Sequence, residues 1–184
     1  MRNRPDQVIL ERAKLFDAQA LEEIFNLYSP GIYRYAFRLL GDADIARECM
    51  SETFSRFLVA LKRGSGPDNY LQAYLYRVAH NWVSDYYRSK VPPSLPLRID
   101  LKADPVDEPH QAVADHLNAE QLRSALFLLT PDQRQVIILR YLEDWEIGSI
   151  AMALNKPIGA VKALQHRALQ ALRRIMSSNE DIKL

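Results

Sequence analysis

The stretch NKPIGAVKALQHRALQALRR, residues 155–174, carries five basic side chains and a histidine but no carboxylate, in a chain whose formal net charge is only +1. Apolar residues recur along it at the spacing of one helix face: Val161, Leu164, Ala168 and Leu172. The rest of the circumference carries Lys162, His166, Arg167, Gln170 and Arg173. The pattern predicts a helix with one buried face and one exposed basic face.

Three residues, Asn155-Lys156-Pro157, separate this helix from a short helix expected over residues 145–154. A turn this short does not let two helices run antiparallel and is typical of a helix-turn-helix. An α-helix fits the major groove of DNA, and a face without carboxylates does not repel phosphate. The residues alone leave two interpretations open: a helix that lies against DNA, or an ordinary helix with a solvated basic face.

Two more helices are expected before this pair, over residues 118–129 and from Thr130-Pro131-Asp132 through Tyr141. A threonine cap followed by a proline in the first turn is a strong helix start. Farther upstream, residues 91–111 hold five of the ten prolines, are acidic and lack a helical period. They predict an extended, flexible linker between two modules.

Apolar stripes predict four helices before that linker. The first stripe stops at Ser29-Pro30-Gly31, where the proline predicts a break, and the second ends at Gly41. Asp42 or Asp44 is expected to cap a third helix that runs to about residue 61, and a fourth covers residues 70–88. No segment alternates with period two, so the chain is predicted to be all-α, with two small helical domains.

Aromatic side chains crowd the fourth of these helices, which holds five of the nine tyrosines and one of the two tryptophans. A single amphipathic helix buries one stripe, so several rings must stay at the surface among cations. Exposed rings interleaved with cations bind unstacked bases. An interface with a partner protein, or a loose edge of the core, explains the same pattern.

The composition of the chain argues against several classes of function. The single Cys49 excludes an internal disulfide framework and any cysteine-based zinc site, and the four histidines lack metal-ligand spacing. The first residues have scattered charges and no apolar run, so neither membrane insertion nor a signal peptide is expected, and the protein is predicted to be cytoplasmic. No catalytic residue, cofactor or metal site is expected.

Four blocks, in order along the chain, resemble the sigma-70 family of bacterial RNA polymerase specificity factors, in its extracytoplasmic-function group. IFNLYSPGIYRYAFRLLGDADIARECMSETFSRFLVAL resembles the start of region two, and YLYRVAHNWVSDYYRSK resembles its promoter-melting end. LTPDQRQVIILRYLEDW resembles the first part of region four, and IGAVKALQHRALQAL its recognition helix. The resemblance implies region two at residues 1–90, a Pro-rich acidic linker at 91–114, and region four at 115–178.

The resemblance also implies three sets of binding residues. Those for the minus-35 duplex are Lys156, Lys162, His166, Arg167, Gln170 and Arg173. Those for the separated strands of the minus-ten element are Tyr70, Tyr74, Arg77, His80, Asn81, Tyr87 and Arg88. Those for the polymerase are Glu48, Ser51, Glu52, Ser55 and Arg56. The recognition helix departs from the family pattern at Ala163-Leu164-Gln165, where Ser-Arg-Leu is usual, so the remaining basic residues must supply most contacts.

By the same resemblance, the protein is expected to direct promoter-specific transcription initiation in response to a stress or envelope signal. The implied partners are core RNA polymerase, through its largest and second-largest subunits, promoter DNA, and an anti-sigma factor. Two alternatives belong to other classes. One is a stand-alone helix-turn-helix regulator that does not bind core polymerase, and the other is a small helical enzyme.

Overall fold

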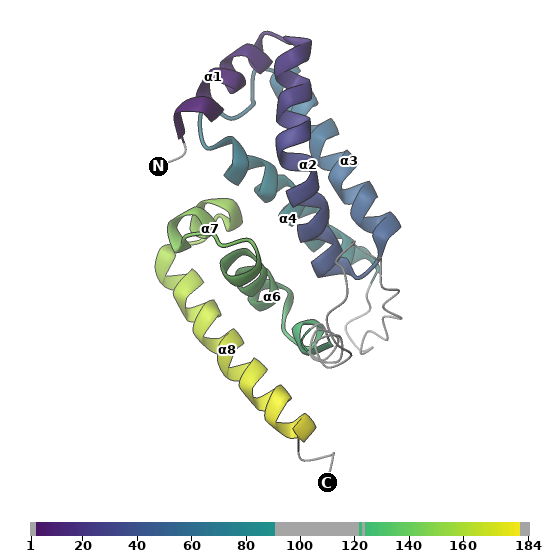
Figure 1. Ribbon diagram of the computed structural model, residues 1–184, viewed down its shortest axis with the longest axis vertical. Helices are drawn as coiled ribbons and strands as arrows, with labels where there is room; N and C mark the ends of the chain where they lie inside the picture. Colours follow the sequence, from purple (N-terminus) through teal and green to yellow (C-terminus); the bar gives the residue numbers. More distant parts are fainter. Residues whose placement is uncertain (1–2, 91–121, 123, 181–184) are drawn as a thin grey trace, which may run out of the picture.

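A computed structural model describes residues 3–90, 122 and 124–180, and these residues form helices joined by turns, with no strand among them. Two bodies are visible in Figure 1. The N-terminal body consists of α1 (Asn3–Lys14), α2 (Ala18–Leu40), α3 (Ala43–Lys62) and α4 (Leu71–Lys90). The C-terminal body contains α6 (Pro131–Ile137), the π-helix η1 (Ile138–Leu142), α7 (Ile147–Leu154) and α8 (Ile158–Glu180). The all-α prediction is confirmed, and no described helix has the length and apolar character of a membrane span.

Capping residues set the helix ends in the N-terminal body. The Asp42 carboxylate accepts hydrogen bonds from the backbone N–H groups of Asp44 and Ile45, both at 2.9 Å, and so caps α3 as predicted. Gly41 ends α2 in the left-handed conformation, with φ of 72°. The Asp17 carboxylate caps the start of α2 in the same manner as Asp42.

The predicted break at Ser29-Pro30-Gly31 is wrong, because α2 runs through Pro30 without interruption. Pro30 is exposed and removes one backbone hydrogen bond near the surface. The buried stripe continues across it: Ile24, Tyr28, Ile32, Tyr35 and Leu39. Packing of this stripe outweighs the local penalty of one proline, so the two expected helices are one.

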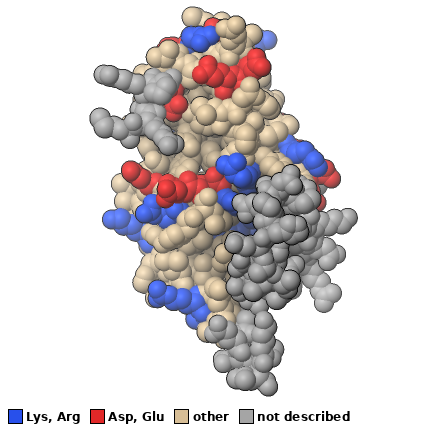
Figure 2. Space-filling model, viewed as in Figure 1, with Lys and Arg blue, Asp and Glu red and all other residues tan. Residues whose placement is uncertain are grey.

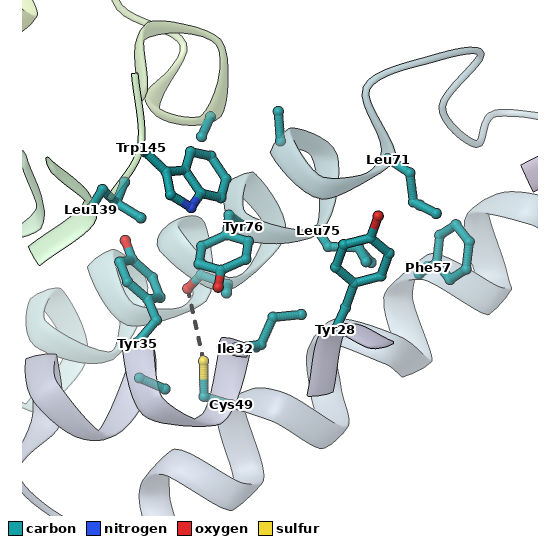
Figure 3. Close-up of a cluster of buried hydrophobic side chains, with 14 of the residues drawn as sticks. Tyr28, Ile32, Tyr35, Cys49, Phe57, Leu71, Leu75, Tyr76, Leu139 and Trp145 are labelled. Carbon is teal, nitrogen blue, oxygen red and sulfur yellow. Dashed lines mark hydrogen bonds between the residues drawn. The ribbon is translucent and has the colours of Figure 1, made fainter. Parts of the chain in front are cut away.

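The core of the N-terminal body lies between α2, α3 and α4 (Figure 3). Tyr35, Phe57 and Leu75 are almost completely buried there. Cys49 is a small core residue, as expected, and burial raises the pKa of its thiol to about 12. A thiol held protonated in this way is neither a nucleophile nor a metal ligand at neutral pH.

In the C-terminal body, α6 begins at the predicted start signal. Thr130 accepts a hydrogen bond from the Gln133 N–H at 3.4 Å, and the Gln133 side chain accepts one from the Thr130 N–H at 3.2 Å. The helix expected to continue through Tyr141 changes to a π-helix at Ile138. The short helix expected from Trp145 starts at Ile147 instead. The linker and residues 118–121 and 123 of the helix expected over residues 118–129 lie outside the described residues, and residues 124–127 are helical as expected.

The two bodies pack against each other, with α7 alongside α4 (Figure 1). The sequence predicted two modules on a tether and gave no sign of this contact. Buried residues of the C-terminal body belong to the same hydrophobic cluster as the core of the N-terminal body: Val136, Ile138, Leu139, Trp145, Ile150, Ala151, Ala153, Leu154 and Val161. A smaller, separate cluster joins α6 to α8 through Ile137, Ala168 and Leu172.

Candidate nucleic-acid interface

The turn between α7 and α8 sets the direction of the basic helix. Asn155 adopts the left-handed conformation, with φ of 51°, and the Lys156 N–H donates to the Ala151 carbonyl at 3.0 Å. Val161, Ala168 and Leu172 fix the inner side of α8, as the apolar spacing predicted. The α7–turn–α8 unit has the form of a helix-turn-helix.

The outer side of α8 is basic and exposed. It carries Lys162, His166, Arg167, Gln170 and Arg173, all of them exposed. Within the described residues no carboxylate lies in ion-pair distance of Lys162, Arg167 or Arg173. In the face shown in Figure 2, the coloured residues of the lower part of the molecule are basic, without acidic ones among them. These cations are free to meet phosphate.

Lys156 differs from the other predicted minus-35 residues. Its ammonium group lies 3.1 Å from the Asp132 carboxylate, which follows the cap of α6. The ion pair ties the turn of the helix-turn-helix to the start of α6. His166 and Gln170 are also linked, with 3.0 Å between their side-chain nitrogens.

Four of the predicted minus-ten residues lie where DNA can reach them. Tyr70, Asn81 and Arg88 are exposed, and Tyr74 is half-buried with its ring 6.1 Å from Phe57. Tyr70 precedes α4 in the left-handed conformation, with φ of 51°, and is 48% exposed. Sequence reasoning missed the stacked pair Trp82 and Tyr86, whose rings are 5.5 Å apart on the same helix.

The other three predicted minus-ten residues face the C-terminal body. Arg77 donates from its guanidinium to the Met152 carbonyl in α7. His80 is 8% exposed, and burial lowers the pKa of its imidazole. The Tyr87 hydroxyl donates to the Leu39 carbonyl and accepts a hydrogen bond from Arg134 at 3.0 Å. The C-terminal body thus covers one side of α4.

Arg134 holds this contact together, and sequence reasoning missed it. It is 2% exposed and donates to the carbonyls of Leu126, Phe127 and Leu129 in its own body. It also reaches the Leu39 carbonyl of the N-terminal body at 2.9 Å. The sequence did contain a signal for this role, because Arg134 lies one helical turn before Ile137 and Ile138 on the side of the helix that is buried. An arginine on such a side must be hydrogen-bonded.

Glu143 is the acidic counterpart at the same boundary. Its carboxylate forms ion pairs with Arg38 and, at 3.7 Å, with Arg34, both on α2. Burial raises the pKa of Glu143 more than the two arginines lower it. A belt of acidic and basic side chains is visible in Figure 2 at the level where the two bodies meet.

The predicted polymerase residues lie on α3. Glu48, Ser51, Ser55 and Arg56 are exposed, and Glu52 is half-buried and accepts a hydrogen bond from Arg56 at 2.8 Å. An apolar strip adjoins them, since Leu58 is 40% exposed and Phe25 is 42% exposed against the Phe54 ring. In the described part of the chain, no three His, Cys, Asp or Glu side chains gather as metal ligands.

Comparison with known proteins agrees with this architecture. Residues 24–91 match Sigma-70 region 2, and residues 125–174 match Sigma-70 region 4. The ECF RNA polymerase sigma factor BldN of Streptomyces coelicolor is 30% identical over 173 residues, which cover 91% of this chain and 64% of BldN. The RNA polymerase sigma-E factor of the same organism is 30% identical, with 83% of each chain covered, and SigW of Bacillus subtilis is 28% identical, with 90% and 93% covered.

Two solved structures share the fold. One is CnrH in complex with the cytosolic domain of CnrY, with a TM-score of 0.71, 19% identity, and 94% of this chain and 97% of the other covered. The second is the sigma factor RpoE in complex with the anti-sigma factor NepR from Bartonella quintana, with a TM-score of 0.65, 22% identity and coverage of 85% and 96%. With both regions matched in order along one helical chain, the protein belongs to the sigma-70 family and is an RNA polymerase sigma factor of the extracytoplasmic-function type.

Proposed function

We propose that this sigma factor divides promoter recognition between its two bodies: α8 binds the minus-35 duplex, α4 holds the separated minus-ten strand, and α3 docks on core polymerase. The observation that carries the proposal is the exposed, carboxylate-free face of α8 behind a tight turn. The corresponding domains are residues 1–90 and 115–178, joined by the linker at 91–114. No catalytic role is proposed for any residue.

For α8, the exposed cations favour binding in the major groove. Lys162, Arg167 and Arg173 carry charge at the circumference of a helix that fits the groove. Contacts of this kind to phosphate fix the position of the helix without reading sequence. His166 and Gln170 hold one another and are the candidates for contact with base edges. Lys156, already paired with Asp132, would contribute at the turn.

For α4, the rings and cations favour single-stranded DNA. The exposed Tyr70 and the half-buried Tyr74 offer surfaces on which bases stack, at about 1–3 kcal/mol per base. Asn81 and Arg88 lie exposed beside them and can reach base edges and phosphates. Arg77, His80 and Tyr87 would join this surface once the C-terminal body moves away.

For α3, the exposed polar residues and the adjoining apolar strip support docking on the largest subunit of core polymerase. Binding of both bodies to one enzyme raises the effective concentration of each for its promoter element, so neither needs high affinity alone. We propose that residues of region 4 before Leu142 lie near the second-largest subunit. The solved relatives were captured with CnrY and with an anti-sigma factor, so we propose a cytoplasmic anti-sigma factor released by a stress or envelope signal.

Transcription in vitro tests the proposal. Promoters would first be located by mapping transcript starts after overproduction of the protein. Run-off transcription on those templates with purified core polymerase should then give product only when the protein is added. Duplex binding by the protein alone, with unchanged run-off product, would contradict the proposal and identify a stand-alone regulator.

A further inference from the structure

A line of exposed residues runs along the outer side of α8, which forms the outer edge of the C-terminal body beside α6 and α7 (Figure 1). The members of this outer line, each of them exposed, are Gly159, Ala163, His166 and Gln170. They follow one another at intervals of three or four positions, which places them on one side of a helix, opposite the buried Val161. The outer line is therefore the part of α8 that would enter a groove first.

Cations lie on both flanks of the outer line. Lys162 and Arg173 are about three helical turns apart, so both lie on one flank, and both are exposed. Arg167 is exposed on the other flank. A helix docked with the outer line on the base pairs would bring cations to the phosphates on either side of a major groove. The charge pattern thus indicates which side of α8 faces the bases.

Two exposed residues in the first turns of α8 are apolar. Ala163 belongs to the outer line, and Ile158, the first residue of α8, is 52% exposed one turn before Lys162. Single apolar residues are common on protein surfaces. These two, however, lie in the N-terminal part of a recognition helix, which is the part that contacts base edges. The apolar group that a major groove offers to such side chains is the C5-methyl group of thymine.

Gly159 lets the backbone of α8 come close to the bases. A Cβ built at this position would have no atom of the described chain within 4 Å, so packing of the protein does not require glycine here. Gly159 lies one turn before Ala163 on the outer line, where a side chain would stand between the helix and DNA. Without that side chain, the short methyl group of Ala163 comes within reach of the base pairs.

We propose that the first turns of α8 recognise thymine: the side chains of Ala163 and Ile158 contact C5-methyl groups in the major groove of the minus-35 duplex. The proposal rests on the proposed binding of that duplex by α8. The cations on both flanks meet phosphates, and the rest of the outer line meets the base pairs that follow. The recognised element therefore contains A·T pairs under the first two turns of α8. Guanine is not required there, because the outer line carries no arginine or lysine to bind it.

Replacement of thymine by deoxyuridine tests this contact, because deoxyuridine pairs in the same way and lacks only the C5-methyl group. A library of randomised duplexes is first selected with the protein, both alone and on core polymerase, and the recovered sequence is made as a fluorescein-labelled duplex. Fluorescence anisotropy then gives the dissociation constant with each thymine replaced in turn. Loss of one buried methyl group corresponds to about fourfold weaker binding. We expect that loss at adjacent thymines and no change at the others.

Variants of the protein identify the side chain that meets each methyl group. In Ala163→Gly, deoxyuridine at one thymine should no longer weaken binding, because the protein's half of the contact is gone, and Ile158→Ala should do the same at the adjacent thymine. Comparison of two duplexes within one variant cancels any effect of the substitution on folding. Ala160→Gly is the matched control: Ala160 is exposed on the same helix but lies off the outer line, so the full loss should remain at both thymines.

Gly159→Ala tests the close approach of the backbone. Urea denaturation followed by circular dichroism should give a free energy of unfolding at least equal to that of the parent, because alanine favours a helix and a Cβ meets no atom of the described chain. Binding of the selected duplex should nevertheless weaken several-fold. Undiminished binding would show that the first turn stands off the bases and would overturn the proposal.

The outcomes separate recognition of thymine from the proposed binding of duplex DNA. Equal binding with thymine and deoxyuridine at every position would overturn the recognition of thymine, and weaker binding by Lys162→Ala would then leave the minus-35 role of α8 in place. A loss that persists in both Ala163→Gly and Ile158→Ala would assign the methyl contact to another residue and would also overturn the proposal. If the protein retains no duplex, alone or on core polymerase, both proposals are overturned.

Discussion

Arg134 is buried where the two bodies meet and forms hydrogen bonds with both of them. Its guanidinium donates to carbonyls of both bodies and lies 4.5 Å from the centre of the Phe127 ring. Burial lowers the pKa of Arg134, and contact with Tyr87 opposes that change. Because planar guanidinium donors match several carbonyls at once, lysine in this place would leave acceptors unpaired.

At single positions of α8, the apolar periodicity predicted correctly which side chains are exposed, but it did not predict which residues they pair with. The exposed Lys162, Arg167 and Arg173 follow directly from the apolar spacing around Val161. The ion pair of Lys156 depends on Asp132, which is distant in sequence, and no local pattern indicates it. Likewise Gln165, on the apolar side of α8, is explained by its hydrogen bond to the Tyr141 hydroxyl at 2.8 Å.

Lys162 provides a residue-scale prediction. If its ammonium group meets one phosphate, Lys162→Ala should weaken binding of a 20-base-pair duplex and make the dependence of log K on log salt shallower by about 0.9. Fluorescence anisotropy across a salt series measures that slope. Arg47→Ala on α3 is the matched control, because Arg47 is exposed on the other body and should leave the slope unchanged. An unaltered slope for Lys162→Ala would place this side chain outside the interface.

Local sequence signals predicted several helix ends correctly. Where a helix differs from the prediction, contacts with residues distant in the chain explain the difference. Asp42, Gly41 and Thr130 marked helix ends correctly, because each satisfies backbone groups within its own turn. Continuity of α2 through Pro30 and the change to a π-helix at Ile138 depend on neighbours in space. The N-terminal α1 was not predicted, since its charges are scattered; Leu10 and Ala13 are nevertheless buried.

The close approach of α2 and α4 provides a prediction at this scale. A Cβ at Gly31 would lie 2.6 Å from the Tyr76 hydroxyl oxygen, and Tyr76 is only 3% exposed. Gly31→Ala should therefore lower the free energy of unfolding by about 1–3 kcal/mol through overpacking. Urea denaturation followed by circular dichroism measures this change.

Gly148, near the start of α7, is the control for that substitution. No atom lies within 4 Å of a Cβ built there. Gly148→Ala should raise the free energy of unfolding by up to about 1 kcal/mol, since alanine loses less backbone entropy in a helix. Equal responses at the two glycines would show that the contact between Gly31 and Tyr76 does not limit the packing of α2 on α4.

For the whole molecule, the sequence predicted two helical domains correctly but could not predict that they touch. The side of α4 that faces the C-terminal body includes Arg77, His80 and Tyr87, which the family resemblance assigned to DNA. A polar side chain that can bind nucleic acid can equally form a hydrogen bond with a polar group of the other body. One sequence pattern therefore fits both a closed arrangement, in which the two bodies touch, and an open one, in which they are apart, and local periodicity does not distinguish them.

Acidity should shift the balance between these arrangements through His80. Burial, with a smaller contribution from Lys156, lowers the pKa of His80 below its ordinary 6.5, and Asp132 opposes this only in part. The closed form thus prefers neutral His80: closure is unaffected above pH 6.5 and weakens as the pH falls below it. Glu143 acts in the opposite sense, because its raised pKa makes protonation favour closure as the pH falls toward 4.5.

Fluorescence emission of Trp145 measures this pH effect in a Trp82→Phe variant, which leaves Trp145, 7% exposed where the two bodies meet, as the only tryptophan. Between pH 7.5 and 5.5 the maximum should move to the red as His80 takes up a proton and the two bodies separate. His80→Gln should abolish the movement, because glutamine does not titrate, and Glu143→Gln should enlarge it by removing the opposing group. A shift that persists in His80→Gln would assign the pH response to another residue, and a shift to the blue in the parent would reverse the sign expected for closure.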